Sequence, residues 1–143
     1  MAIREIAVFV ENRPGEISMV TSVLAEAGIN LLAINIAETS DYGILRLIAD
    51  DCVKAQQVLS EGGYIVNLSD VYAVAVPDRP GGLCEVLKKL ASKNVDIAYM
   101  YSVFSMRQDL AYMVFCPKEG TDLAAAIADC GYAVSDAEAL GIK

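Results

Sequence analysis

Histidine and tryptophan are absent from the 143-residue chain, and positive charge is scarce, with 11 Lys+Arg against 19 Asp+Glu and a net charge of −8. Without histidine, the chain cannot form a Ser-His-Asp or Cys-His nucleophile pair or a zinc site that uses histidine. The acidic balance disfavours nucleic-acid binding, because such binding draws most of its affinity from Lys and Arg at phosphates. We therefore expect neither a histidine-based catalytic centre nor a nucleic-acid partner.

Long hydrophobic runs are also missing. Apolar runs such as 123–128 are far shorter than the roughly 20 residues that span a bilayer. Arg4 and Glu5 stand where the apolar core of a secretory signal would lie. We expect a cytoplasmic protein without a membrane partner.

The four cysteines lie far apart, at positions 52, 84, 116 and 130, and form no C-x-x-C pair. This spacing is typical of small buried hydrophobic residues in a reducing compartment, and it predicts no metal site. Apolar residues make up 55% of the chain and charged residues 21%, which is ample material for a packed core.

An internal repeat is the main feature of the sequence. Residues 12–17, Asn-Arg-Pro-Gly-Glu-Ile, recur 66 positions later at 78–83 as Asp-Arg-Pro-Gly-Gly-Leu. Gly63-Tyr64-Ile65-Val66 matches Gly131-Tyr132-Ala133-Val134 at an offset of 68, so a two-residue insertion separates the two blocks. We expect this insertion after the third strand, and we predict two domains, 1–70 and 71–143.

Within each copy, β-branched runs and helical periods alternate in the order β-α-β-β-α-β. The first copy is expected to hold strands 3–10, 29–39, 44–49 and 64–68 and helices near 16–27 and 51–60; the second, strands 71–76, 95–105, 110–116 and 132–134, a turn at 106–109, and helices 82–92 and 121–129. This order predicts an α+β fold of two ferredoxin-like units with antiparallel sheets, packed together because their linker is short.

A unit of this size, with Asn/Asp-Arg-Pro-Gly after its first strand and Gly-Ile-Asn before its second, resembles an ACT domain, and the likeness covers the chain twice. ACT domains are regulatory modules that usually bind amino acids at interfaces between units. The resemblance therefore implies an amino-acid effector, no other cofactor, a homodimer, and a regulated partner such as an enzyme of amino-acid metabolism. The first copy is especially similar to the serine-sensing ACT domain of bacterial phosphoglycerate dehydrogenase, which implies that Asn12 and Asn30 hold the ligand.

The chemistry of the loop independently favours binding of a zwitterion. Pro14 has no N–H and Gly15 lets the backbone approach a ligand, so we expect the amides of Glu16 and Ile17 to point at open space. A helix start with unpaired N–H groups suits a carboxylate, and asparagine amides can both donate to a carboxylate and accept from an ammonium.

The second copy carries Asp78 and Asp96 at the positions of the two asparagines, which favours an ammonium and disfavours a carboxylate. Gly82 in place of Glu16 is expected to open more room. The candidates to contact the ligand side chain are the strand residues Leu31, Leu32, Ile34, Ile97, Tyr99, Met100 and Tyr101. The predicted ligand-binding set is Asn12, Arg13, Gly15, Glu16, Ile17, Asn30, Leu31, Asp78, Gly81, Gly82, Leu83, Asp96 and Ile97.

Simpler interpretations exist for these residues. Asn12 and Asp78 are residue types that cap turns and helix starts. Asn30 and Asp96 suit a turn after a glycine, and Arg13 suits a solvated surface as well as a carboxylate clamp.

Three functional hypotheses follow: a non-catalytic regulatory protein that binds an amino acid, an interaction module without a ligand, and a small enzyme. We favour the first, because no catalytic constellation is found in the sequence.

Overall fold

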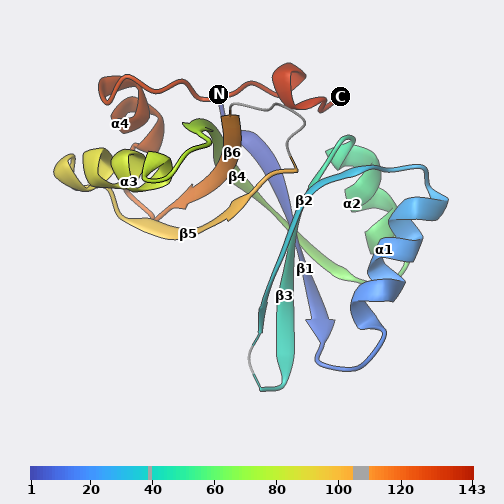
Figure 1. The fold of residues 1–143 in the computed structure, drawn as a ribbon. Helices are drawn as coiled ribbons and strands as arrows, with labels where there is room; N and C mark the ends of the chain where they lie inside the picture. Colours follow the sequence, from blue (N-terminus) through green and yellow to red (C-terminus); the bar gives the residue numbers. More distant parts are fainter. Residues whose placement is uncertain (39, 105–109) are drawn as a thin grey trace. The chain divides into compact units, whose positions relative to one another are not determined.

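The computed structural model describes residues 1–38, 40–104 and 110–143, so the predicted turn at 106–109 lies outside the described residues. The described elements alternate along the chain as the repeat predicts (Figure 1). They are β1 (Ile3–Glu11), α1 (Glu16–Glu26), β2 (Leu31–Glu38), β3 (Tyr42–Ala49), α2 (Cys52–Glu61), β4 (Ile65–Pro77), α3 (Gly82–Ser92), β5 (Ile97–Ser102), β6 (Leu110–Pro117), α4 (Leu123–Asp129) and the 3-10 helix η1 (Glu138–Leu140).

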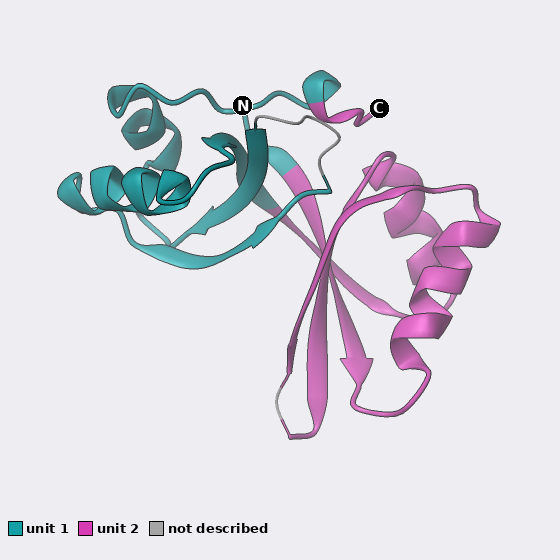
Figure 2. Cartoon of the chain, viewed as in Figure 1, with its two compact units in different colours: residues 1–3, 70–139 teal, residues 4–69, 140–143 magenta. Residues whose placement is uncertain are grey.

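The chain divides into two compact units (Figure 2). Residues 4–69 and 140–143 form the first-repeat unit, and residues 1–3 and 70–139 form the second-repeat unit. The strand order is β2-β3-β1-β4 in the first-repeat unit and β4-β6-β5 in the second, and the paired strands β1–β3, β2–β3, β4–β6 and β5–β6 are antiparallel. The predicted α+β class with two ferredoxin-like units is confirmed.

The predicted boundary at 70/71 differs from this division at both ends of the chain. The segment 1–3 belongs to the second-repeat unit and the segment 140–143 to the first. The backbone N–H of Lys143 donates to the carbonyl oxygen of Asp50 at 2.6 Å, and Lys143 Nζ lies 3.6 Å from Asp50 Oδ2. Local sequence patterns do not predict a contact between Lys143 and Asp50, because the two residues are far apart in sequence.

The core of the first-repeat unit lies between its sheet and one layer of helices. Alternate residues of β1, namely Ile6, Val8 and Val10, are at most 5% exposed and pack with Val20 of α1 and Leu59 of α2. Burial of such side chains stabilises a fold by about 1.5–3 kcal/mol each. The apolar residues that alternate along β1 and those that recur every 3.6 residues along α1 therefore pack in one core.

The second-repeat unit repeats this arrangement. Val74 and Val76 of β4 pack with Val86 and Leu90 of α3 and with Ile127 of α4. No helix in the described part of the chain combines the length and the apolar character needed to cross a bilayer.

The predicted position of the two-residue insertion is wrong. Ala33 pairs with Ile48 in the first repeat, and Tyr99 pairs with Cys116 in the second. The offset is therefore still 66 at the second strand and already 68 at the third, so the insertion lies between these two strands. Sequence blocks on either side of a gap bound its position, but only the pairing register locates it.

The predicted strand 132–134 is reduced to a single bridge between Val134 and Val74. Ser135 N–H still donates to the carbonyl oxygen of Ala73 at 2.7 Å. Asp136 then accepts a hydrogen bond from the N–H of Ala139 at 2.8 Å and starts η1.

Asp122 caps α4, because its Oδ1 accepts a hydrogen bond from the N–H of Ala125 at 3.1 Å. We expect Asp122→Ala to lower the free energy of unfolding by about 1 kcal/mol, measured by urea denaturation. Asp129→Ala, which removes an exposed carboxylate at the other end of the same helix, is the matched control and should cost nothing. Equal losses in the two variants would show that the cap is not the cause.

Candidate functional site

The Asn/Asp-Arg-Pro-Gly motif forms the same turn in both repeats. After β1, the N–H of Arg13 donates to the carbonyl oxygen of Glu11 at 2.9 Å, and the N–H of Glu16 donates to that of Arg13 at 3.3 Å. Gly15, at the N-cap of α1, has a φ of 88°, and Gly81 before α3 has a φ of 83°. Glycine adopts this left-handed conformation without the strain that a side chain would add, which explains why both copies of the motif end on it.

The amide of Glu16 was expected to be free, and it is not, because it closes the turn onto Arg13. The next amide, that of Ile17, belongs to the first helical turn, whose N–H groups have no partner within the helix. Asn12 does not act as a helix cap, since Gly15 occupies that position and no side chain caps α1. The capping interpretation of Asn12 therefore does not account for this residue.

Arg13 lies between two carboxylates. Its Nε is 2.9 Å from Glu11 Oε2, and its Nη2 is 2.7 Å from Glu16 Oε1. The hydrogen bond to Glu16, followed by the negative charge of Glu11, raises the pKa of Arg13. Because the guanidinium already has these two partners, it is neither a purely solvated side chain nor an unoccupied clamp for a ligand carboxylate.

The turn borders a hollow in the first-repeat unit. Four predicted residues, Asn12, Arg13, Glu16 and Ile17, line a small part of it, about 50 Å³, together with Ile36, Glu38 and Gly43 from β2 and β3 and with the end of β1. Val10, Glu11 and Glu16 also line the neighbouring, larger cavity. The sequence motif thus marks one wall of the hollow.

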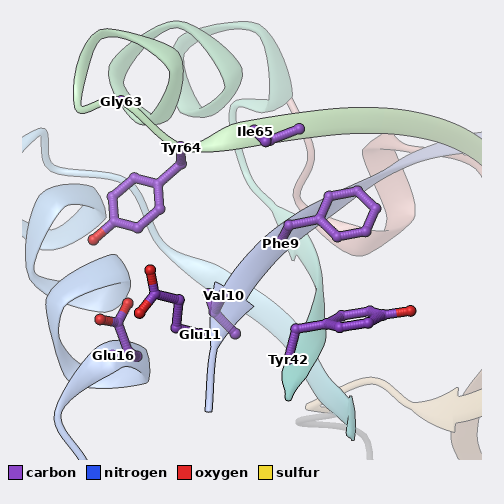
Figure 3. A pocket seen from close by; sticks show the side chains of 8 residues that line it. All are labelled: Phe9, Val10, Glu11, Glu16, Tyr42, Gly63, Tyr64 and Ile65. Carbon is purple, nitrogen blue, oxygen red and sulfur yellow. The ribbon is translucent and has the colours of Figure 1, made fainter. Parts of the chain in front are cut away.

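The larger cavity, about 330 Å³, lies between β1, β3, α1 and the start of β4. It is lined by Phe9, Val10, Glu11, Glu16, Tyr42, Gly63, Tyr64 and Ile65. In Figure 3 the hydroxyl of Tyr64 and the carboxylates of Glu11 and Glu16 point into the same space, with the rings of Phe9 and Tyr42 on the other side of the end of β1. These two rings have their centroids 6.4 Å apart.

Sequence reasoning missed most of these residues. Phe9, Tyr42 and Ile65 stand in strands, where an aromatic or β-branched residue is ordinary and carries no functional signal. Tyr64 did have a signal, because Gly63-Tyr64 recurs as Gly131-Tyr132 in the second repeat. That recurrence was used to define the repeat and was not considered as part of a site.

Asn30 lies at the other end of α1 from Asn12. The helix between them has 11 residues and is therefore about 16 Å long. The N–H of Asn30 donates to Asp50 Oδ1 at 2.9 Å, and the N–H of Asp50 donates to the carbonyl oxygen of Asn30 at 3.0 Å. One copy of the chain therefore does not bring the two asparagines together around a small ligand.

The second repeat differs from expectation at two positions. Gly82 opens no room, because it is buried and a Cβ atom there would lie 2.1 Å from the carbonyl oxygen of Pro77. Asp96 is exposed, and its Oδ2 is 2.8 Å from Lys118 Nζ. Its carboxylate already has a cation beside it.

The remaining predicted residues are placed as follows. Asp78 is exposed in the second turn, as Asn12 is in the first. Leu31 packs on the core of the first-repeat unit, and Leu83 and Ile97 pack on that of the second. The rings of Tyr99 and Tyr101 are stacked, with centroids 6.4 Å apart.

No group of three or more metal-ligating side chains gathers anywhere in the described ranges. Burial raises the pKa of the Cys52 thiol, which lowers the fraction present as the nucleophilic thiolate.

The chain matches the family model described as an ACT domain pair over residues 1–126. Among solved structures, protein BT0572 from Bacteroides thetaiotaomicron is 35% identical, with a TM-score of 0.89 over 99% of this chain and 96% of that chain. The ligand-free regulatory subunit of aspartate kinase from Thermus thermophilus is 19% identical, with a TM-score of 0.65 over 89% and 91% of the two chains. At that identity it supports the fold alone. No curated protein matches the chain.

The family model covers both turn motifs, the first repeat and most of the second, and the structure adds the strand order and the two compact units. The chain belongs to the ACT domain family, as a pair of ACT domains.

Proposed function

We propose that this ACT domain pair is a non-catalytic, cytoplasmic regulatory protein that binds a free amino acid at the Asn12–Ile17 turn. The observation that carries the proposal is the hollow at that turn, bordered by a helix start on one side and by carboxylates on the other. The amino acid is the only small molecule in the proposal, and no cofactor is required.

Each charged group of an amino acid has a matching feature here. The positive end of α1, with the amide of Ile17, suits an α-carboxylate. Glu11 and Glu16 suit an ammonium, and the Asn12 side chain can donate to one group or accept from the other. Ligand pockets combine a few convergent polar groups with an apolar lining, here Phe9 and Val10.

A homodimer is part of this proposal. Asn12 and Asn30 both belong to the first repeat and flank opposite ends of α1. If both touch one ligand, as the resemblance to the serine-sensing domain implies, each must come from a different copy of the chain. The regulated partner would be an enzyme of amino-acid metabolism, as aspartate kinase is for the Thermus thermophilus regulatory subunit that shares the fold.

A thermal-shift screen of the twenty amino acids with the full chain tests the proposal. A ligand at about 100 times its Kd adds about 2.7 kcal/mol to the free energy of unfolding, which raises the melting temperature by several degrees. Asn12→Ala and Asn30→Ala should each remove the shift. Asn67→Ala, which changes an exposed asparagine of β4 that is not among the residues lining the hollow, should retain it.

Two results would contradict the proposal. The first is the absence of a shift with all twenty amino acids, which would favour the interaction module. The exposed Ile17, Ile36 and Tyr42 around the hollow give the interaction module a physical basis.

The second contradictory result is light scattering that finds only particles of 15.3 kDa in the presence of a bound amino acid, which would exclude a ligand shared by two copies.

A further inference from the structure

Tyr64 and Tyr132 occupy the same place in the two repeats. Each follows a glycine of positive φ, 87° at Gly63 and 81° at Gly131. The N–H of Tyr64 donates to the carbonyl oxygen of Leu59 at 3.1 Å, and that of Tyr132 donates to the carbonyl oxygen of Ile127 at 3.1 Å. The two rings can therefore be compared as alternative versions of one position.

In the second repeat, a lysine covers this ring. Lys89 Nζ lies 4.9 Å from the centroid of the Tyr132 ring and 3.5 Å from Glu85 Oε1. A cation between an aromatic face and a carboxylate is held by both the ring quadrupole and the opposite charge. The hydrogen bond with Tyr132 raises the pKa of Lys89, in line with a position that favours the protonated amine.

In the first repeat, the position of Lys89 is taken by Val23, which packs on the core and carries no charge. The carboxylates near the ring are contributed instead by Glu11 and Glu16, which stand at the positions of Pro77 and Gly82. The first repeat thus keeps the ring, but Met19 stands at the position of Glu85, and the carboxylates are those of Glu11 and Glu16, which also contact Arg13. It has a cavity of about 330 Å³ and no lysine at the matching helix position.

The charged side chains around the hollow are mostly negative. The charged residues that line its two parts are Glu11, Glu16 and Glu38, against the single cation Arg13. Phe9 and Tyr42 add two aromatic rings, where the second repeat has Ala75 and Leu110. A net negative hollow with aromatic lining attracts an organic cation more than it attracts a neutral or an acidic side chain.

We propose that the cavity beside Tyr64 selects amino acids with a cationic side chain and takes the ammonium or guanidinium group that Lys89 supplies to Tyr132 in the second repeat. This inference rests on the proposed function, because it names the class of amino acid that binds at the Asn12–Ile17 turn. The aliphatic part of such a side chain would lie against Val10, and its charged end would face Glu11, Glu16 and the ring of Tyr64.

Isothermal titration of the full chain with L-lysine, L-arginine and L-norleucine tests the inference. Norleucine has the same carbon chain as lysine and lacks the terminal ammonium. We expect lysine or arginine to bind about tenfold more tightly than norleucine, the size of effect that a desolvated cation–aromatic contact supports. Tyr64→Leu should reduce this preference to about threefold or less, whereas Tyr132→Leu, the same change in the second repeat, should leave it intact.

A second variant tests the internal comparison. Val23→Lys places a lysine where the second repeat has Lys89, and it should weaken binding of free lysine at least tenfold by occupying the cavity from within. A long lysine stem can cover the apolar surface that Val23 covers, and a melting curve of the variant checks that the fold is retained. Unchanged lysine binding in a folded Val23→Lys variant would overturn the inference.

The two proposals fail in different ways. If norleucine or another neutral amino acid binds as tightly as lysine and arginine, the charge selectivity is wrong and the proposed function stands. If no amino acid binds, the proposed function is wrong and the inference is overturned with it.

Discussion

Gly82→Ala is expected to lower the free energy of unfolding by about 3 kcal/mol, one of the largest effects of a single substitution in this chain. The Cβ atom would lie 2.1 Å from the carbonyl oxygen of Pro77 and 3.1 Å from its carbonyl carbon. Neither contact is relieved by a side-chain rotation, because both atoms belong to the backbone. The turn between β4 and α3 would have to move, and urea denaturation measures the cost.

Gly62→Ala is the matched control. Gly62 ends α2 with a φ of −74°, and its added Cβ would meet the carbonyl oxygens of Val58 and Leu59 at 3.4 Å, an ordinary contact. We expect a change of less than about 1 kcal/mol. If the two variants lose the same stability, close backbone packing at Gly82 is not the reason for glycine there.

Arg46→Leu is expected to cost about 3 kcal/mol, because it removes a cation that lies beside a buried carboxylate. Glu5 is 0% exposed, and its Oε1 lies 3.8 Å from Arg46 Nε, whose side chain is 15% exposed. The register explains the contact: Arg46 pairs with Ala7, two residues along β1 from Glu5 and on the same face. Chemical denaturation at neutral pH measures the loss.

The double variant Glu5→Leu, Arg46→Leu separates the pair from the surrounding packing. The double variant removes the buried carboxylate together with the cation beside it, so it should be more stable than Arg46→Leu alone. A double variant that loses the sum of the two single effects would mean that the two charges do not interact appreciably.

The candidate site could be predicted from sequence only in part. Asn12, Arg13, Glu16 and Ile17 are contiguous, recur as a motif, and all line the hollow. Tyr42 begins β3 and Tyr64 directly precedes β4, and they reach the same cavity because β3 and β4 flank β1 in the sheet order. Motif reasoning finds residues that are close in sequence, whereas strand pairing decides which distant ones join them.

The role of Gly82 shows a limit of residue-type reasoning. Its small size suggested open space beside the ligand position, but the space is filled by the backbone of Pro77. A glycine indicates that no side chain fits or that a special φ is required, and it does not say which. Only the coordinates of the neighbouring chain distinguish an open site from a crowded one.

The sequence by itself determined the two copies, their order of strands and helices, the Arg-Pro-Gly turns and the lack of a histidine-based catalytic centre, since repeats, periodicities and composition are local properties. The tertiary structure alone decided that Asn12 and Asn30 of one copy flank opposite ends of α1, a helix about 16 Å long. It also decided that Arg13 is engaged by two carboxylates, that Lys89 covers Tyr132, and that segment 140–143 joins the first-repeat unit. These depend on which strands pair and where each helix ends, because contacts between distant residues arise from the packing of whole elements.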